Sequence, residues 1–145
     1  MALLREVDKG RTFVGRLQKG DDLLIALGEI CSKEKIVLGE VRAIGALSRA
    51  RISYYNQKQR SYETIEFPEA TELVALVGNI SLKDGAPFVH AHVTLADEEG
   101  RAFGGHLVNG CEVFACEFVI QELVSAMTFE RGMDEDTWLA LWRRE

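Results

Sequence analysis

The chain has 145 residues, of which 47% are hydrophobic and 28% are charged, and its formal net charge at pH 7 is −6. This length and composition predict one globular domain, residues 1–145, and a membrane span is not expected because no run approaches about eighteen apolar residues. The acidic balance disfavours broad electrostatic binding to nucleic acid, which needs Lys and Arg against the phosphates, although a local basic surface stays open.

The first third of the chain predicts a strand followed by the main helix. Residues 1–10 (MALLREVDKG) lack the apolar core of a signal peptide, so the cytoplasm is the expected compartment. Residues 11–17 (RTFVGRL) alternate sufficiently for a strand, and residues 20–22 (GDD) then open a helix with an Asp as its N-cap. An apolar stripe at helical spacing would pack this helix onto a sheet: Leu23, Leu27, Ile30 and Cys31.

A long hairpin is predicted next. Residues 39–47 and 50–56 form one arm, with a bend or bulge near Gly45, and residues 62–67 return after a polar turn. Basic and aromatic side chains gather here, and Arg with Tyr can contact phosphates and stack on bases. The candidate nucleic-acid contacts are therefore Arg49, Arg51, Tyr54, Tyr55, Lys58 and Arg60. An edge hairpin whose charges discourage pairing with other chains is the alternative interpretation, and no zinc-finger spacing or RNA-recognition signature accompanies the cluster.

Residues 71–82 (TELVALVGNISL) are apolar on both faces. This pattern suits a central strand that is covered by the helix on one side and by another subunit on the other. Asn79 falls on this strand and can reach the face that the next strand presents.

All three histidines lie in a second predicted hairpin, residues 87–110. On its first arm the apolar residues alternate with His90 and His92, which point to one side with their Cα atoms roughly 6.6 Å apart. The side that His106 faces depends on the register. If Ala96 pairs with Arg101, His106 faces away; one further loop residue, or a bulge at Gly104–Gly105, brings it opposite His92.

Three imidazoles that leave a fourth position open are typical of catalytic rather than structural zinc sites. We therefore predict a divalent transition metal, with zinc the first candidate, on His90, His92 and His106. Solvated histidines on a non-core face are the alternative interpretation. The candidate residues lining the site are Asn79, Gly104, Gly105, Cys111 and Glu112; Asn79 or Glu112 would hydrogen-bond a ligand's second nitrogen, and Cys111 would be an additional ligand. Spacing alone identifies no general base, so the catalytic residues stay unknown.

The last part of the chain predicts one more long strand and a short helix. Residues 111–123 (CEVFACEFVIQEL) are rich in β-branched and aromatic residues, which favours a strand. Residues 127–131 add a short strand. After Gly132, Asp134 or Asp136 would cap a brief terminal helix that carries Trp138 and Trp142.

Residues 78–110 (GNISLKDGAPFVHAHVTLADEEGRAFGGHLVNG) resemble the PPC (plants and prokaryotes conserved) domain in its stand-alone bacterial and archaeal form, because HAH, an acidic turn, GGH and Gly-Cys follow in order. Residues 39–56 (GEVRAIGALSRARISYYN) fit the same family. The resemblance implies an α+β domain that assembles as a homotrimer. Together with the elements above, it predicts a mixed and largely antiparallel sheet packed against one main helix plus a short C-terminal helix. It also implies that His90, His92 and His106 match histidines that hold a metal in some prokaryotic members, whereas plant members are fused to AT-hooks and act on DNA.

Three functions are consistent with these features. The first is a metal-dependent small-molecule enzyme or ligand-binding module, and its ligand is unknown. The second is a DNA-binding or regulatory protein that uses the hairpin 49–62. The third is an assembly module whose histidine face is a pocket between subunits with no chemistry. No GxGxxG loop and no GxSxG elbow is present to indicate a dinucleotide site or a serine hydrolase.

Overall fold

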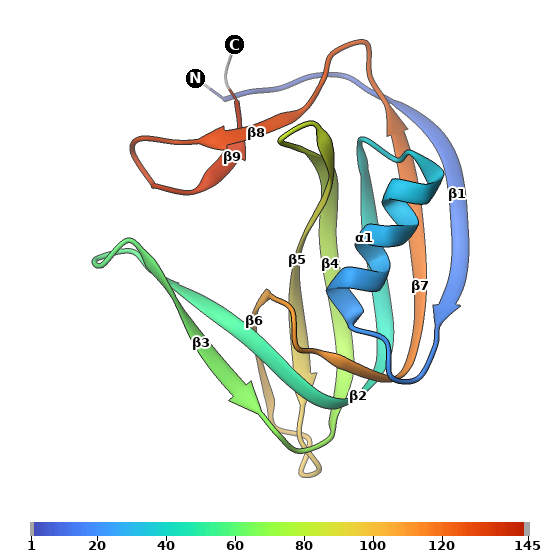
Figure 1. Cartoon of the computed structure of the whole chain (residues 1–145), viewed down its shortest axis with the longest axis vertical. Coiled ribbons are helices and arrows are strands. Elements are labelled where there is room, and N and C mark those ends of the chain that lie inside the picture. The colour runs from blue at the N-terminus through green and yellow to red at the C-terminus, as the bar shows by residue number, and fades with distance from the viewer. Residues whose placement is uncertain (1, 144–145) are drawn as a thin grey trace.

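The computed structural model describes residues 2–143, in which a single helix lies across one face of a twisted sheet (Figure 1). The sheet of the described residues follows the order β1-β7-β2-β6-β5-β4-β8-β9; β3 pairs with β2, and β2 also pairs with β4. The elements are β1 (Asp8–Leu17), α1 (Leu23–Glu34), β2 (Gly39–Asn56), β3 (Ser61–Phe67), β4 (Thr71–Lys83), β5 (Ala86–Ala96), β6 (Ala102–Leu107), β7 (Glu112–Val124), β8 (Glu130–Met133) and β9 (Ala140–Trp142).

Every strand pair is antiparallel except β4 with β8, among the residues described. The α+β class and the largely antiparallel sheet on one main helix agree with the prediction. The helix is too short to span a membrane, and no other helix of residues 2–143 is long and apolar enough to do so.

Helix α1 begins where the sequence predicts. The Asp22 carboxylate accepts hydrogen bonds from the backbone N–H groups of Leu24 and Ile25, each at 3.1 Å, as an N-cap does. The predicted stripe faces the sheet, with Leu23, Leu27 and Cys31 fully buried and Ile30 packed against the core. The helix ends at Lys35, whose left-handed backbone lets its N–H bond the last carbonyls.

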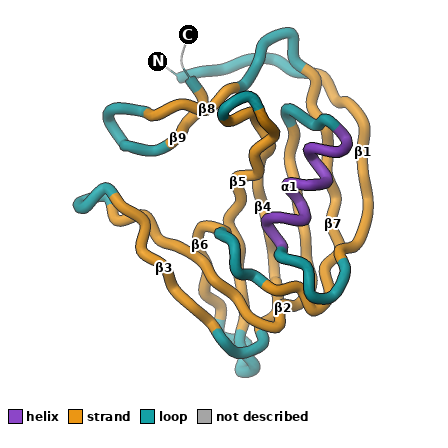
Figure 2. Tube along the Cα trace, viewed as in Figure 1, coloured by secondary structure: helices purple, strands orange, loops and turns teal. Residues whose placement is uncertain are grey.

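The helix covers one face of β5. Val89, Ala91, Val93 and Leu95 are buried in the core, whereas the residues between them point to the opposite face. Because the side chains of a strand alternate, this burial turns His90 and His92 away from α1. The hairpins β2–β3 and β8–β9 extend beside β5 and β6 (Figure 2), and residues of both hairpins share a pocket with the two histidines.

The long strand β2 bends where the sequence places Gly45. Its pairing shifts register between Ala43 and Gly45 against β4 and again after Ala46 against β7. A Cβ at Gly45 would overlap the carbonyl oxygen of Ala115, so the close approach of β7 requires glycine here. The bend carries the second half of β2 away from the main sheet, where it pairs with β3 and, at Ile52 and Ser53, with β6.

The predicted C-terminal helix is wrong. Residues 130–142 instead form a small hairpin in which β8 pairs with β9, and β8 also pairs with β4. The Asp134 carboxylate holds a tight turn by accepting from the backbone N–H (3.0 Å) and the hydroxyl (2.6 Å) of Thr137, and Trp138 is left-handed. A run this short cannot offset the cost of helix nucleation, so the long-range bonds of the hairpin decide its structure.

We predict that Asp22→Ala destabilises the protein by about 2 kcal/mol, at the upper end for N-cap removal. The loss is large because the same carboxylate also accepts from the backbone N–H of Gly110 at 2.6 Å, which ties the segment after β6 to the helix. Urea unfolding would measure the change. Asp22→Asn, which keeps an acceptor for the helix, should lose less than half as much; equal losses for both variants would contradict the cap.

Candidate metal centre

The register of the β5–β6 hairpin brings the three histidines to one face. Ala96 pairs with Ala102, one residue later than the pairing that would turn His106 away, and His92 therefore lies directly opposite His106. The loop 97–101 supplies the further residue, so no bulge is needed at Gly104–Gly105. Asp97 fixes this loop by accepting from the backbone N–H groups of Glu99 (3.0 Å) and Arg101 (2.9 Å).

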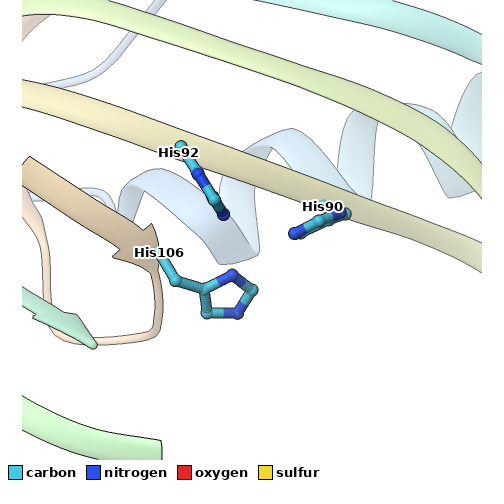
Figure 3. A group of neighbouring side chains, drawn as sticks. All are labelled: His90, His92 and His106. Atoms are coloured by element: carbon cyan, nitrogen blue, oxygen red, sulfur yellow. The ribbon is translucent and has the colours of Figure 1, made fainter. Parts of the chain in front are cut away.

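The three imidazoles surround one point (Figure 3). Their ring centroids are 5.2 to 5.6 Å apart, and one ligand nitrogen from each ring lies within 4.8 Å of the other two. A zinc ion bonds imidazole nitrogen at about 2.0–2.1 Å, so closing the triangle on an ion requires each ring to move inward by roughly 1 Å or less. That is within the reach of small side-chain rotations.

The electrostatic environment favours the neutral form of two of these imidazoles, His90 and His106. The pKa of His90 is lowered to about 4, mainly by burial and then by the positive charge of Arg131 and by the other two histidines. Burial, followed by His92 and Arg131, also lowers the pKa of His106. The neutral form is the one that ligates a metal, since a protonated nitrogen has no free lone pair.

One ring nitrogen of the site has no protein partner. Nδ1 of His106 is buried and accepts or donates no hydrogen bond within residues 2–143. A buried polar nitrogen left in this way loses free energy unless something else satisfies it. The residues present therefore fit a metal ion: three imidazoles offer converging nitrogen donors, and one of the three has an otherwise unsatisfied nitrogen.

The histidines open into a pocket of about 570 Å³. One wall comes from β2 and β3, with Tyr54, Tyr55 and Tyr62, and the Tyr62 ring lies 5.0 Å from that of His106. The other wall comes from the β8–β9 hairpin. The two walls meet where the Tyr55 hydroxyl donates to the Thr137 carbonyl at 2.7 Å and where Arg60 lies over the Trp138 ring.

Residues 4–124 match the model of the Plants and Prokaryotes Conserved (PCC) domain, the family that the sequence resembles. The chain belongs to this family. Among solved structures, a plant- and prokaryote-conserved protein of Pyrococcus horikoshii is 40% identical, with a TM-score of 0.91 and 99% of both chains covered. The metal-containing protein of Archaeoglobus fulgidus is 38% identical, with a TM-score of 0.93 over 99% of this chain and 100% of that one.

More distant relatives of the PCC domain differ in description and in length. A candidate DNA-binding protein of Bacteroides thetaiotaomicron is 24% identical, with a TM-score of 0.84 over 94% of this chain and 96% of that one; at this identity the likeness shows the fold alone. The bifunctional protein GlmU of Synechococcus sp. strain JA-3-3Ab is 31% identical over 128 residues, 88% of this chain and 19% of that protein. The chain thus spans about a fifth of the length of the curated relatives it matches.

Within this PCC domain, two of the predicted lining residues lie next to the histidines, and the other three have structural contacts elsewhere. Asn79 pairs with His90 across β4 and β5, and Gly105 lines the pocket. A Cβ at Gly104 would instead meet the carbonyl oxygen of Val93, so that glycine serves the close approach of β5.

Cys111 and Glu112 lie away from the triad. The Cys111 thiol is fully buried and bonds the backbone of Arg51, accepting from its N–H at 3.4 Å and donating to its carbonyl at 3.1 Å. Glu112 forms an ion pair with Arg49 at 3.4 Å. Neither side chain is among those whose ligand atoms converge in the described residues.

Carboxylates neutralise part of the positive charge of the basic hairpin, residues 49–62. Arg49 pairs with Glu112, and Arg51 pairs with Glu66 on β3 at 3.4 Å. Tyr54 and Tyr55 line the histidine pocket, while Lys58 and Arg60 lie in or beside the exposed turn. Two of the four predicted cationic contacts thus have a carboxylate partner.

Sequence reasoning missed Arg131, which lies on β8 and lines the same pocket. It is 6% exposed and bonds the Asn79 side chain, which in turn is paired with His90. No local pattern distinguishes this arginine, because its position depends on the parallel pairing of β8 with β4 across about fifty residues of chain.

We predict that His90 of the metal-free protein titrates with a pKa of about 4, well below an ordinary histidine. Since the unfolded chain then binds the proton first, the folded metal-free protein should lose stability as pH falls from about 6.5 to about 4, with no further loss from this group below that. NMR of the imidazole protons, assigned with His90→Asn, would measure the midpoint. An ordinary midpoint near 6.5 would contradict the buried environment.

Proposed function

We propose that this PCC-domain protein binds a divalent transition metal ion, with zinc the first candidate, through His90, His92 and His106, and that the adjoining pocket takes a small-molecule ligand. The observation that carries the proposal is the convergence of three imidazoles on one point, with a buried, unsatisfied nitrogen on one of them, His106. The description of the 38% identical Archaeoglobus fulgidus protein as metal-containing supports it. Three imidazole ligands leave a position at which such an ion polarises water or a carbonyl oxygen.

The chain's own residues favour binding over proton transfer. None of the described residues that line the pocket is an Asp or a Glu, so a carboxylate general base is lacking there. Tyr55 already donates its hydroxyl proton to a backbone carbonyl, and burial raises the pKa of Tyr62. A site with donors and a metal but no base is suited to hold a ligand or to act as a Lewis acid.

Binding to DNA is the weaker proposal for this chain. Phosphate contacts need unpaired Lys and Arg side chains, and two of the four cations on the basic hairpin are paired with carboxylates. The remaining two, Lys58 and Arg60, are too few for a specific interface of ordinary size. The net charge of −6 opposes association as well.

Assembly as a homotrimer is part of the proposal, and the exposed apolar residues of the sheet support it. On the face away from α1, several large apolar side chains are at least half exposed: Val14, Ile44, Val74, Val77 and Phe114. Ile44 and Val74 line one hollow of about 370 Å³ on this face. Monomers rarely leave such a group of apolar residues in water, so a second copy of the chain is the expected cover.

We predict that His92→Ala lowers the bound metal at least about tenfold, because two imidazoles hold an ion far less tightly than three. Elemental analysis of protein purified without a histidine tag measures the metal, and circular dichroism reports the fold. Thr94→Ala is a matched control, since Thr94 is the next outward-facing residue of β5. Retention of wild-type metal by His92→Ala would refute the proposed site.

We predict that size-exclusion chromatography with light scattering gives three times the 16.2 kDa chain mass, and that Ile44→Lys reduces it. Lys is chosen because Ile44 pairs with Glu117, so the fold of the single chain gains a favourable neighbour while the apolar face gains a charge. Ile25→Lys, on the outer side of α1, should leave the mass unchanged. A wild-type monomer would contradict the assembly.

A further inference from the structure

Arg131 is a buried cation that has no carboxylate partner in the described part of the chain. Its guanidinium donates to three neutral oxygens: Ser81 Oγ at 2.9 Å, Ala140 O at 3.0 Å and Asn79 Oδ1 at 2.5 Å. No Asp or Glu among residues 2–143 comes within ion-pair distance of it. A buried charge is unfavourable without a counter-charge, and neutral acceptors with two flanking aromatic rings offset only part of that cost.

The guanidinium has N–H groups left for a ligand. Arginine carries five N–H donors, and the three bonds above use one on each nitrogen. The remaining N–H groups lie on the two terminal nitrogens. A guanidinium presents such donors in a plane, which matches the two oxygens of a carboxylate.

Arg131 and the histidines share one pocket. Asn79, which accepts from Arg131, is the cross-strand partner of His90, and Phe88, over whose ring Arg131 lies, is two residues before His90 on the same face. Arg131 and all three histidines line the same cavity of about 570 Å³, so one small molecule in it can contact both.

The pocket is positive within an acidic protein. The chain has 23 Asp and Glu residues against 17 Lys and Arg, yet the described lining of this pocket contains Lys83 and Arg131 and no carboxylate. A metal ion on the histidines would add to the same sign. Such a cavity concentrates anions.

From these observations we infer that Arg131 is the anion-binding residue of the pocket and that the ligand is a small organic carboxylate. Its carboxylate lies on the guanidinium, and its body lies beside the three histidines, between Tyr54, Phe88, Trp138 and Leu141. These aromatic and aliphatic walls favour an organic acid over inorganic phosphate. The inference rests on the proposed metal-binding function only for the part of the ligand that lies beside the histidines. The contact of the ligand's carboxylate is with Arg131 and needs no metal.

The test is calorimetric titration of the untagged protein with mandelate, a carboxylate that carries a hydroxyl and a ring, beside mandelamide, its neutral amide. We expect mandelate to bind at least about tenfold more tightly than mandelamide, and Arg131→Met to lose at least about tenfold in mandelate affinity. Arg101→Met is the matched control, because Arg101 lies on the exposed turn of the β5–β6 hairpin and should not change binding. Inorganic phosphate is titrated as a third probe, and we expect it to bind more weakly than mandelate.

Metal content, measured on the same samples, separates this inference from the proposed function. If the purified protein holds no metal, the proposed function fails; the metal-free protein should still prefer mandelate over mandelamide in an Arg131-dependent manner. If Arg131→Met does not fold, the test uses Arg131→Lys instead, together with the preference of the metal-free wild type for mandelate over mandelamide. Lys83→Met then shows how much of the mandelate affinity comes from Lys83, the second cation of the pocket. Two results would overturn the inference: equal binding of mandelate and mandelamide, or unchanged mandelate affinity in a folded Arg131 variant. The absence of mandelate binding at about 10 mM would overturn it as well, because the guanidinium would then be satisfied by a neighbouring copy of the chain and not by a ligand.

Discussion

The register between β5 and β6 is the constraint on which the site depends. Ala96 opposite Ala102 places His106 opposite His92, and a shift by one residue would turn every side chain of one strand to the other face. The core enforces this register, because the face of β5 that alternates with the histidines is buried under α1. Burying an aliphatic side chain contributes about 1.5–3 kcal/mol, so exposing Val89, Val93 and Leu95 together would cancel much of a typical stability of about 5–15 kcal/mol. The hydrophobic core thereby fixes the geometry of a polar site on its far side.

Local patterns in the sequence predict what is decided locally. The alternation around His90, the Asp22 cap and the bend near Gly45 each arise from neighbouring residues, and the structure has all three. The sequence leaves the register open between two pairings, since a loop of four or five residues between Ala96 and the returning strand satisfies the same turn composition. In the structure the loop has five residues, and the Asp97 carboxylate holds its backbone.

Long-range pairing is what the sequence does not reveal. Residues 134–142 have a cap and apolar spacing that suit a short helix, but β8 joins β4 and its Arg131 reaches three acceptors in other elements. Cys111 and Glu112 follow the histidine hairpin closely in sequence, yet the chain there enters β7, whose partners are β1 and β2. Cys111 and Glu112 are therefore near the histidines in sequence but not in space. Arg131 is far from the histidines in sequence but lines the same pocket.

The histidine triad and the exposed apolar residues lie on the same side of the sheet, away from α1. His92 pairs with Val77 across β5 and β4, so both side chains point away from α1, and Val77 belongs to the exposed apolar residues. Any copy of the chain that covers Val77 therefore borders the histidines. Binding of an ion to the imidazoles and burial of that face would then act on the same strand pair, and an ion that favours the assembled form must, by linkage, be bound more tightly by it. The proposed assembly and the proposed metal binding would therefore be thermodynamically coupled.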